Sequence, residues 1–581
     1  MANFDEIARR ADVAVTTFGG LNRSGPLCGG KDCFELLNLR PMADGTLSRR
    51  EGYRPLWSFD EPIRDVIALE RDGKCEVYMI VGTTMYTSDG VCEPFAIGDV
   101  PDGGAAHLVC VDGNALLLTG REIMLLSLDG ARPVLPYVPL YGKDWSPLLN
   151  GERAIWERPN LLTNRIRVSI RMPSGEIYIH LSDLNPLSVD AVLIGGSEKA
   201  VEGWTYDARR GYCMLNQTCP DGERVDLVMT MPDSFFGQRS DPRGAVRTAV
   251  VGNAEDRRLL MFGGALLPGQ AYMTRAVDEA ERAIVRAIDP ESCPMLYVTE
   301  EDKITIGDGV QPITGACCHY DRSLIFMPRG VWMMDNEVHD DGSLRMIPVN
   351  ATLGCTADGG CAVVGNSPYT IFGRRVLRWN DRTDERDECN AEALSGKVEM
   401  LFDEAFGRDG RVVSHPWRRE VYFYCPGHDS RVFVFSEESG VWTSFDGFSP
   451  EGMLLLGERL AFFSGRTLYL FDEGATTDVH EDGSEHPIRA RYEGQYLDFG
   501  HAGRQRRIYG VSVTAECEEA RLTLHDARGR TVERMLRGAD GNLSVMQIRG
   551  RGGRFRFVRA GIECTDTSRF RLHGIRLTVG P

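Results

Sequence analysis

Long apolar runs are missing from this sequence: none of its 581 residues lies in an uninterrupted stretch of eighteen apolar residues, about the length that a membrane-spanning helix requires. The opening residues, MANFDEIARRADVAVTTFGG, also lack the apolar segment that a secretory signal carries. Both absences predict a chain with no membrane segment that first folds in a cytosol. At about 150 residues per domain, its length predicts three or four domains.

Catalytic motifs are absent as well. The chain has no HExxH, no GxSxG and no phosphate-cradling glycine loop. The S-x-D-x-G-x-x-W turn of sialidase-type propellers is missing too, since Ser444-Phe445-Asp446-Gly447 and Ser88-Asp89-Gly90 have the wrong spacing. The acidic run from Asp381 to Glu388 is interpreted as a solvated loop. We therefore expect no enzyme activity, no catalytic residue and no cofactor.

Cysteine is abundant, with sixteen residues, but its spacing favours neither disulfides nor zinc. Free cysteines in a reducing compartment are usually buried and behave as small apolar residues. The pairs considered were Cys213 with Cys219, Cys355 with Cys361, the adjacent Cys317 and Cys318, and Cys28 with Cys33. Because His319, His415, His480 and His486 also stand at no metal-binding spacing, we expect no metal site.

Charge is unevenly spread. The net charge is -18, yet residues 487–581 contain 18 Arg, no Lys and 10 acidic residues, so this part carries +8 and the remainder -26. Such asymmetry indicates charged neighbours. The acidic excess has two interpretations: a channel wall that repels DNA phosphates, or a surface that keeps the protein soluble.

A repeated hairpin organises the chain. A short apolar strand meets a tight turn with Gly or Pro, and a second apolar strand ends on Asp or Asn, in YMIVGTTMYTSDG (78–90), ALLLTGREIMLLSLDG (115–130), SLIFMPRGVWMMDN (323–336), YTIFGRRVLRWND (369–381) and LAFFSGRTLYLFDEG (460–474). A period near forty residues with several short strands per unit is typical of propeller blades. Counting a further blade at 412–445, we expect six blades and a seventh between 245 and 300.

Other segments flank the repeat. Residues 140–240 alternate like antiparallel strands and predict a small inserted β domain, whereas the clean alternation over 487–581 predicts a β-sandwich. The polar stretch VHEDGSEHP (479–487) is expected to be a linker. The predicted fold is thus all-β: an N-terminal assembly segment (1–58), propeller blades (59–139 and 241–478), the inserted domain and the C-terminal sandwich.

Several segments follow one another in a familiar order: FGGLN (18–22), NLRPMADGTLSRREGY (38–53), PLYGKDW (139–145), ERPNLLTNRIRV (157–168), YDARRGYCMLNQTCPDGERVDLVM (206–229), GGALLPGQAYMTR (263–275) and ITGACCHYDRSLIFMPRGVWMM (313–334). In this order, which spans most of the chain, the sequence resembles the propeller-containing tail hub or nozzle proteins of tailed bacteriophages, also called packaged-DNA stabilisation proteins. It departs from that family in its many cysteines and in being shorter than the longest nozzles.

The resemblance implies a virion structural protein assembled in the host bacterial cytoplasm. It implies a homo-oligomeric ring, with a hexamer favoured, that contacts portal, adaptor and other tail proteins. The ring would join head to tail, seal packaged DNA and form the channel through which double-stranded DNA leaves without sequence-specific binding. Members of this family are not enzymes. The alternative is a tail protein whose propeller or sandwich binds or degrades host glycans.

Arginines supply the candidate contact residues. The stretches ARGR (527–530) and RGRGGRFRFVR (549–559) place aromatics between arginines, a pattern that also fits nucleic-acid binding, but simple strand alternation explains most of it. We instead expect the basic module to face an acidic surface of an adjacent subunit, which would orient assembly. The candidate subunit or partner contacts are Arg49, Arg50, Arg528, Arg530, Arg549, Arg551, Arg554 and Arg556.

Overall fold

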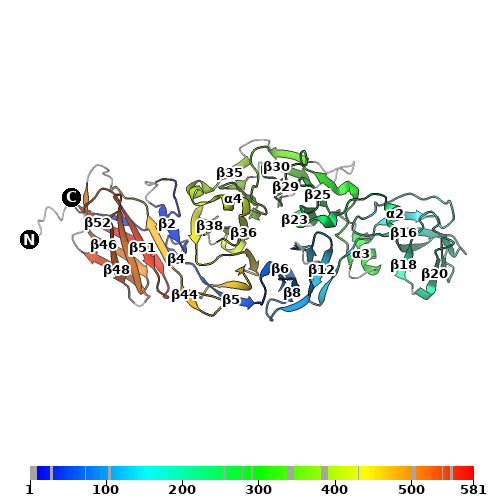
Figure 1. Cartoon of the computed structure of the whole chain (residues 1–581), viewed down its shortest axis with the longest axis horizontal. Helices are drawn as coiled ribbons and strands as arrows, with labels where there is room; N and C mark the ends of the chain where they lie inside the picture. Colours follow the sequence, from blue (N-terminus) through cyan, green and yellow to red (C-terminus); the bar gives the residue numbers. More distant parts are fainter. Residues whose placement is uncertain are drawn as a thin grey trace, which may run out of the picture.

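The computed structural model places three units along the long axis of the molecule (Figure 1). A C-terminal sandwich lies at one end, a β-propeller in the middle and an inserted domain at the other end. The structure describes residues 10–25, 31–71, 73–101, 106–199, 201–252, 257–277, 279–288, 292–320, 322–335, 346–380, 390–428, 431–499, 505–539, 541–549 and 554–580. No helix in these ranges is both long and apolar enough to cross a membrane.

The propeller has seven four-stranded antiparallel blades, which confirms the predicted all-β fold and the seventh blade. The first three blades are β6 (Ile63–Arg71), β7 (Lys74–Val81), β8 (Thr84–Ser88) and β9 (Phe95–Asp99); β10 (His107–Val111), β11 (Asn114–Leu118), β12 (Ile123–Ser127) and β13 (Gly130–Pro133); and β23 (Arg247–Gly252), β24 (Arg257–Phe262), β25 (Gln270–Met273) and β27 (Lys303–Thr305).

The last four blades complete the ring. They are β28 (Gly315–His319), β29 (Arg322–Phe326), β30 (Val331–Asp335) and β31 (Met346–Asn350); β32 (Cys361–Val364), β33 (Ser367–Phe372), β34 (Arg375–Trp379) and β35 (Ala391–Ala393); β36 (Arg411–His415), β37 (Glu420–Tyr424), β38 (Val432–Ser436) and β39 (Val441–Phe445); and β40 (Gly452–Leu456), β41 (Arg459–Ser464), β42 (Thr467–Asp472) and β5 (Gly52–Ser58).

Consecutive apolar residues in the blade strands are explained by burial on both faces. In β11, Leu116 packs toward β24 of the following blade, whereas Leu117 packs toward Tyr78 of the preceding blade. Successive side chains of a strand point to opposite faces, so a blade between two neighbours needs apolar residues at adjacent positions. The two-residue turns at Gly82 and Gly465 both adopt positive φ, as the hairpin spacing predicts.

The outer strand of the last blade comes from the N-terminal part of the chain. β5 pairs antiparallel with β42 and supplies the outer strand of the last blade. The inner strands β6, β10, β23, β28, β32, β36 and β40 contact one another in that order, and β40 contacts β6. The ring is therefore closed by strands that lie more than four hundred residues apart in sequence.

The inserted domain lies between the second and third blades and has its own core. Arg167, buried in this domain, forms an ion pair with Glu281 of helix α3 (Glu279–Ile288), which is inserted in the third blade. The elements of the domain are β15 (Leu140–Trp145), β16 (Arg165–Met172), β17 (Tyr178–His180), β18 (Ser188–Ile194), β19 (Ser197–Glu198), β20 (Trp204–Asp207), β21 (Tyr212–Leu215), β22 (Glu223–Thr230) and α2 (Asp233–Phe236).

The C-terminal sandwich takes strands from both ends of the chain. One sheet contains β1 (Ala11–Val15), β3 (Leu39–Pro41), β4 (Leu47–Arg49), β46 (Arg506–Glu516), β49 (Leu543–Arg549), β50 (Arg554–Phe555) and β52 (Arg571–Gly580). The other contains β2 (Cys33–Leu37), β45 (Ala490–Gly494), β47 (Glu519–Asp526), β48 (Thr531–Arg537) and β51 (Val558–Cys564), and β2 joins it to β39 of the propeller.

Two predictions about connecting segments are corrected. Residues 1–58 do not form a separate assembly segment, because their described strands pair within the sandwich and the last blade. The predicted linker after the last blade contains part of a short hairpin, β43 (Thr477–Val479) with β44 (Glu485–Pro487). Its polar composition fits the turn between these strands, where Gly483 adopts positive φ.

Candidate functional site

Four of the predicted contact arginines meet at one end of the sandwich. Arg528 and Arg530 lie in the turn after β47, where Asp526 accepts hydrogen bonds from both backbone N–H groups at 2.8 Å. The Arg530 guanidinium pairs with Asp526 and donates to the carbonyl of Arg554 in β50 at 3.4 Å. We call Arg528, Arg530, Arg554 and Arg556 the basic tip.

The basic tip is directed toward solvent. All four side chains are exposed, and Arg530 is held by Asp526. Within the described ranges, no acidic side chain forms an ion pair with Arg528, Arg554 or Arg556. Arginine guanidinium groups are well suited to pairing with carboxylates or phosphates.

Arg49 and Arg50 were predicted as contacts, and the structure contradicts this. Arg49 is 9% exposed and donates to the carbonyls of Asp566 and Ser568. Arg50 is 2% exposed and pairs with Asp478. Both link the N-terminal strands to other parts of the chain, so neither can reach a partner. The Arg549 side chain and Arg551 lie outside the described residues.

Opposite charge resides in the propeller. Residues 59–139 hold 13 acidic and 5 basic residues, and residues 241–478 hold 38 acidic and 24 basic residues, so the two propeller segments together carry -22. The sandwich segment 487–581 carries +8. The segments that form the sandwich and the propeller therefore carry net charges of opposite sign.

The inserted domain exposes an apolar loop between β15 and β16. Its exposed apolar side chains are Leu148, Leu149, Ile155 and Trp156, between 50% and 61% accessible. The ammonium group of Lys143 lies 4.2 Å from the centre of the Trp156 ring. Clustered exposed apolar side chains often mark interaction sites. This loop belongs to the unit at the far end of the molecule from the sandwich (Figure 1).

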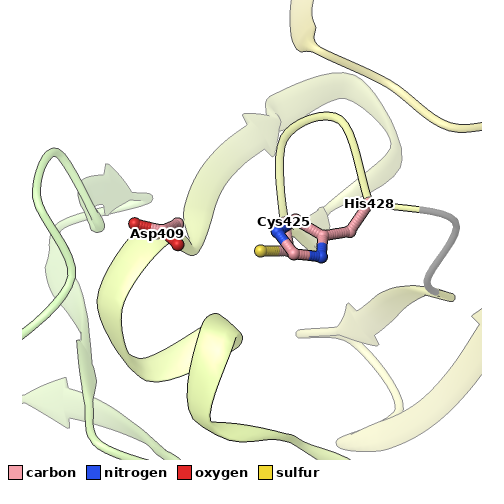
Figure 2. Close-up of side chains that lie close together, drawn as sticks. All are labelled: Asp409, Cys425 and His428. Carbon is pink, nitrogen blue, oxygen red and sulfur yellow. The ribbon is translucent and has the colours of Figure 1, made fainter.

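A group of potential metal ligands lies beside the sixth blade (Figure 2). Asp409 is the last residue of helix α4 (Glu404–Asp409), Cys425 directly follows β37, and His428 stands three residues later. Their ligand atoms all lie within 4.8 Å of one another. The predicted absence of a metal site depended on Cys–Cys spacings and on other histidines; the sequence signal for this group is the Cys-Pro-Gly-His stretch at 425–428.

Comparisons with known proteins identify no relative by sequence: no protein-family model matches, and no curated protein matches. Solved structures that are similar include the mitotic checkpoint complex (11% identity, TM-score 0.33, covering 72% of this chain and 94% of that chain). The Neurospora crassa Pan2 WD40 domain has 8% identity and a TM-score of 0.34, with 73% and 95% covered. YCF48 bound to D1 peptide has 9% identity and a TM-score of 0.32, with 76% and 99% covered. Similarity this low carries no inference about function.

Most described cysteines are buried and unreactive. Burial raises the pKa of Cys213 to about 12 and, with the carboxylate of Glu76 as a second cause, raises the pKa of Cys110 to about 11. A protonated thiol is a poor nucleophile, so these residues serve packing. Cys92 is the exposed exception among the described cysteines. The acidic run that begins at Asp381 lies outside the described residues.

Proposed function

We propose that this chain is a structural subunit of a tailed-bacteriophage particle, a tail hub or nozzle-like ring component that joins head to tail. The carrying observation is the basic tip: among the described residues, no acidic side chain forms an ion pair with Arg528, Arg554 or Arg556, while the propeller segments carry a strongly negative net charge. A surface left uncompensated within one subunit is expected to be compensated by the next.

The placement of the exposed surfaces supports a ring. The basic tip and the apolar loop belong to units at opposite ends of the molecule (Figure 1). Head-to-tail contacts between unlike surfaces close into rings when the rotation between subunits allows it. A hexamer placed against portal and adaptor proteins would surround a channel for double-stranded DNA. Acidic walls would repel phosphates, so DNA would pass without a strong electrostatic hold.

The oligomeric state tests this proposal directly. Full-length protein should be measured by native mass spectrometry and negative-stain microscopy, alone and mixed with the portal protein encoded in the same genome. We expect a closed ring of one stoichiometry, or one that forms on the portal, and its assembly should weaken as salt rises because the tip is exposed. A protein that stays monomeric in both conditions would contradict the proposal.

The glycan-binding alternative has one supporting feature, a polar groove of about 220 Å³ on the face of the sandwich sheet. Two of its three carboxylates are paired: Glu563 with Arg489 at 3.1 Å, and Glu493 with Arg559 at 2.8 Å. The third, Glu533, is exposed. A groove lined mainly by paired charges and polar groups supports recognition of a polar ligand such as a glycan. Cleavage of host polysaccharide by the purified monomer would establish this alternative instead of the ring.

A further inference from the structure

The side chains of Asp409, Cys425 and His428 converge from two structural elements (Figure 2). In this view the sulfur of Cys425 lies between the carboxylate of Asp409 and the ring of His428. The helix end fixes Asp409, because the N–H of Gly410 bonds to the carbonyl of Phe406. The turn fixes the other two, because the N–H of His428 bonds to the carbonyl of Cys425 at 3.3 Å.

The turn between Cys425 and His428 brings these two side chains close together. Gly427 adopts φ of +67°, a conformation that glycine takes without strain. A further hydrogen bond, from the Gly427 N–H to the carbonyl of Pro450, ties the turn to the next blade. A Cys-x-x-His spacing in such a turn brings a sulfur and an imidazole to one side, as metal-binding turns do.

The chemistry of the three donors selects among ions. A thiolate, an imidazole and a carboxylate together suit a borderline divalent ion such as Zn²⁺, whereas Ca²⁺ and Mg²⁺ prefer all-oxygen sites. Three protein ligands also leave one position of a tetrahedral ion for water or another ligand. Cys425 lines a cavity of about 200 Å³ together with Phe402 and Phe433. The sulfur ligand therefore lies beside this cavity, whereas His428 is exposed on the surface.

We propose that Asp409, Cys425 and His428 bind a zinc-like divalent ion that links helix α4 to the turn after β37. On binding, the metal–sulfur bond replaces the S–H bond of Cys425 and the proton passes to solvent. No metal site was expected from the sequence, and this proposal departs from that expectation. The proposal is independent of the proposed assembly function.

The charge state of the ligands is compatible with this exchange. Burial, followed by the neighbouring carboxylates of Asp409 and Asp403, raises the pKa of Cys425 to about 11, so the metal must displace a proton. Hydrogen bonds from the exposed Arg408 lower the pKa of Asp409, which keeps its carboxylate ionised. Arg408 binds both Asp409 oxygens, at 2.7 to 3.1 Å, and would share this carboxylate with the ion.

Cobalt titration of the full-length protein tests the site. The protein is purified with a chelator, freed of it, and titrated with Co²⁺ while the thiolate-to-cobalt charge-transfer absorption is recorded. We expect the band to saturate near one ion per chain and Zn²⁺ to abolish it by displacement. Cys425→Ser should remove the band, whereas His428→Ala and Asp409→Asn should weaken Co²⁺ affinity by at least about tenfold.

Two controls make the result specific. Cys92→Ser removes an exposed thiol whose sulfur lies 3.6 Å from a carboxylate oxygen of Asp89. Cys92 and Asp89 thus resemble the Cys425 and Asp409 pair but lack a nearby histidine ligand among the described residues. This variant should leave the cobalt band unchanged. His428 is exposed, so His428→Ala keeps the test decisive even where Cys425→Ser folds poorly. No band in the wild type, a band that survives Cys425→Ser, or cobalt binding that instead requires His480 and His486, whose rings lie 4.5 Å apart, would overturn the proposal.

Discussion

Arg50 donates two hydrogen bonds to Asp478, at 2.9 Å to one carboxylate oxygen and 2.7 Å to the other. The pair joins the strand segment before β5 to β43, residues that are 428 positions apart in the chain. Arg50 also donates to the side-chain oxygen of Asn38 and to the carbonyl of Asp446. One buried guanidinium thus connects the sandwich strands, the sixth blade and the β43–β44 hairpin.

Removal of this guanidinium should destabilise the fold strongly. Arg50→Ala leaves Asp478 as a buried charge without its partner, and breaking such a pair costs about 3–5 kcal/mol. Chemical denaturation of the variant and the wild type measures the loss. Arg54→Ala is the matched control, because Arg54 and Asp472 lie 3.3 Å apart with about half of each side chain exposed, and exposed pairs contribute at most about 1 kcal/mol. Equal losses in both variants would contradict the structural role of Arg50.

Glu51 makes the stability depend on pH. Burial alone would raise the pKa of Glu51, but the guanidinium groups of Arg40 and Arg418 outweigh it and hold the pKa below its ordinary value of 4.5. Because the folded pKa is lowered, this stabilisation is complete above about pH 4.5 and is lost as the pH falls through the folded pKa. Glu51→Gln should therefore destabilise the protein at pH 7, and the difference from wild type should shrink by pH 3.

Glu473→Gln is the control for this pH dependence. Glu473 contacts the same Arg418 at 2.8 Å, yet its side chain is 84% exposed. An exposed pair contributes little and is screened by salt. Unfolding free energies should be measured at several pH values for both variants and the wild type. The difference between Glu51→Gln and the wild type should become smaller as the pH falls, whereas Glu473→Gln should differ little from the wild type at any pH. A Glu51→Gln deficit that stays constant from pH 7 to pH 3 would rule out the ionic contribution.

Tyr53 in β5 should hold the ring closed. Its side chain is 2% exposed, and its ring meets Phe462 edge-to-face at 5.0 Å and Tyr469 at 5.3 Å. Truncating a large buried aromatic side chain costs about 3–5 kcal/mol, so Tyr53→Ala should lower the melting temperature and expose the last blade to protease. Tyr178→Ala, at a position that is 41% exposed, should change stability by about 1 kcal/mol or less. Normal protease resistance in Tyr53→Ala would show that the Tyr53 side chain is not needed to hold β5 in the last blade.

Strand pairing between distant segments was beyond prediction from sequence. The blade hairpins are local, so their apolar strands and turns, such as the one at Gly373, were recognised directly. The sequence of β5 does not differ recognisably from that of other strands, so it does not show that β5 completes the last blade. Its partner β42 is also distant in sequence. The third blade was hard to recognise because α3 separates its strands β25 and β27.

Burial divides the arginines that were predicted as contacts into two groups. Arg49 and Arg50 stand in a polar stretch that sequence alone suggests is exposed, but their chain neighbours fold into two units and bury both side chains. Arg554 and Arg556 are exposed on either side of the buried Phe555, as the alternation of β50 with its flanking residue predicts. The Cys425–His428 spacing was visible in the sequence, whereas the contribution of Asp409 required the helix end to fold back beside the turn.

Reversing the charge of the basic tip should abolish assembly without affecting folding. Arg528→Glu, Arg554→Glu and Arg556→Glu combined would place negative charge where an acidic propeller is expected to dock, and like charges across an interface disfavour association. The melting temperature should stay unchanged, since no acidic side chain in the described ranges pairs with these three arginines. Native mass spectrometry at low and high salt measures the loss of oligomer.

The control for the tip must carry the same charge change. Arg209→Glu, Arg329→Glu and Arg459→Glu alter three exposed arginines outside the sandwich and shift the net charge equally. We expect this variant to assemble as the wild type does. Loss of assembly in both variants would mean that net charge alone is responsible, and the basic tip would then have no special role.

The apolar loop of the inserted domain should be the second half of the subunit contact. Trp156 is 61% exposed and Leu149 54% exposed, so replacing both with Ser removes apolar surface that is mostly in contact with water in the free monomer. An anchoring Trp at an interface commonly contributes about 2 kcal/mol or more, which predicts a dissociation constant raised at least about thirtyfold. Sedimentation equilibrium measures this constant. The matched variant, Leu187→Ser with Val310→Ser, removes side chains that are 66% and 71% exposed elsewhere. If the loop variant self-associates as tightly as this control, the loop does not lie in the interface between copies.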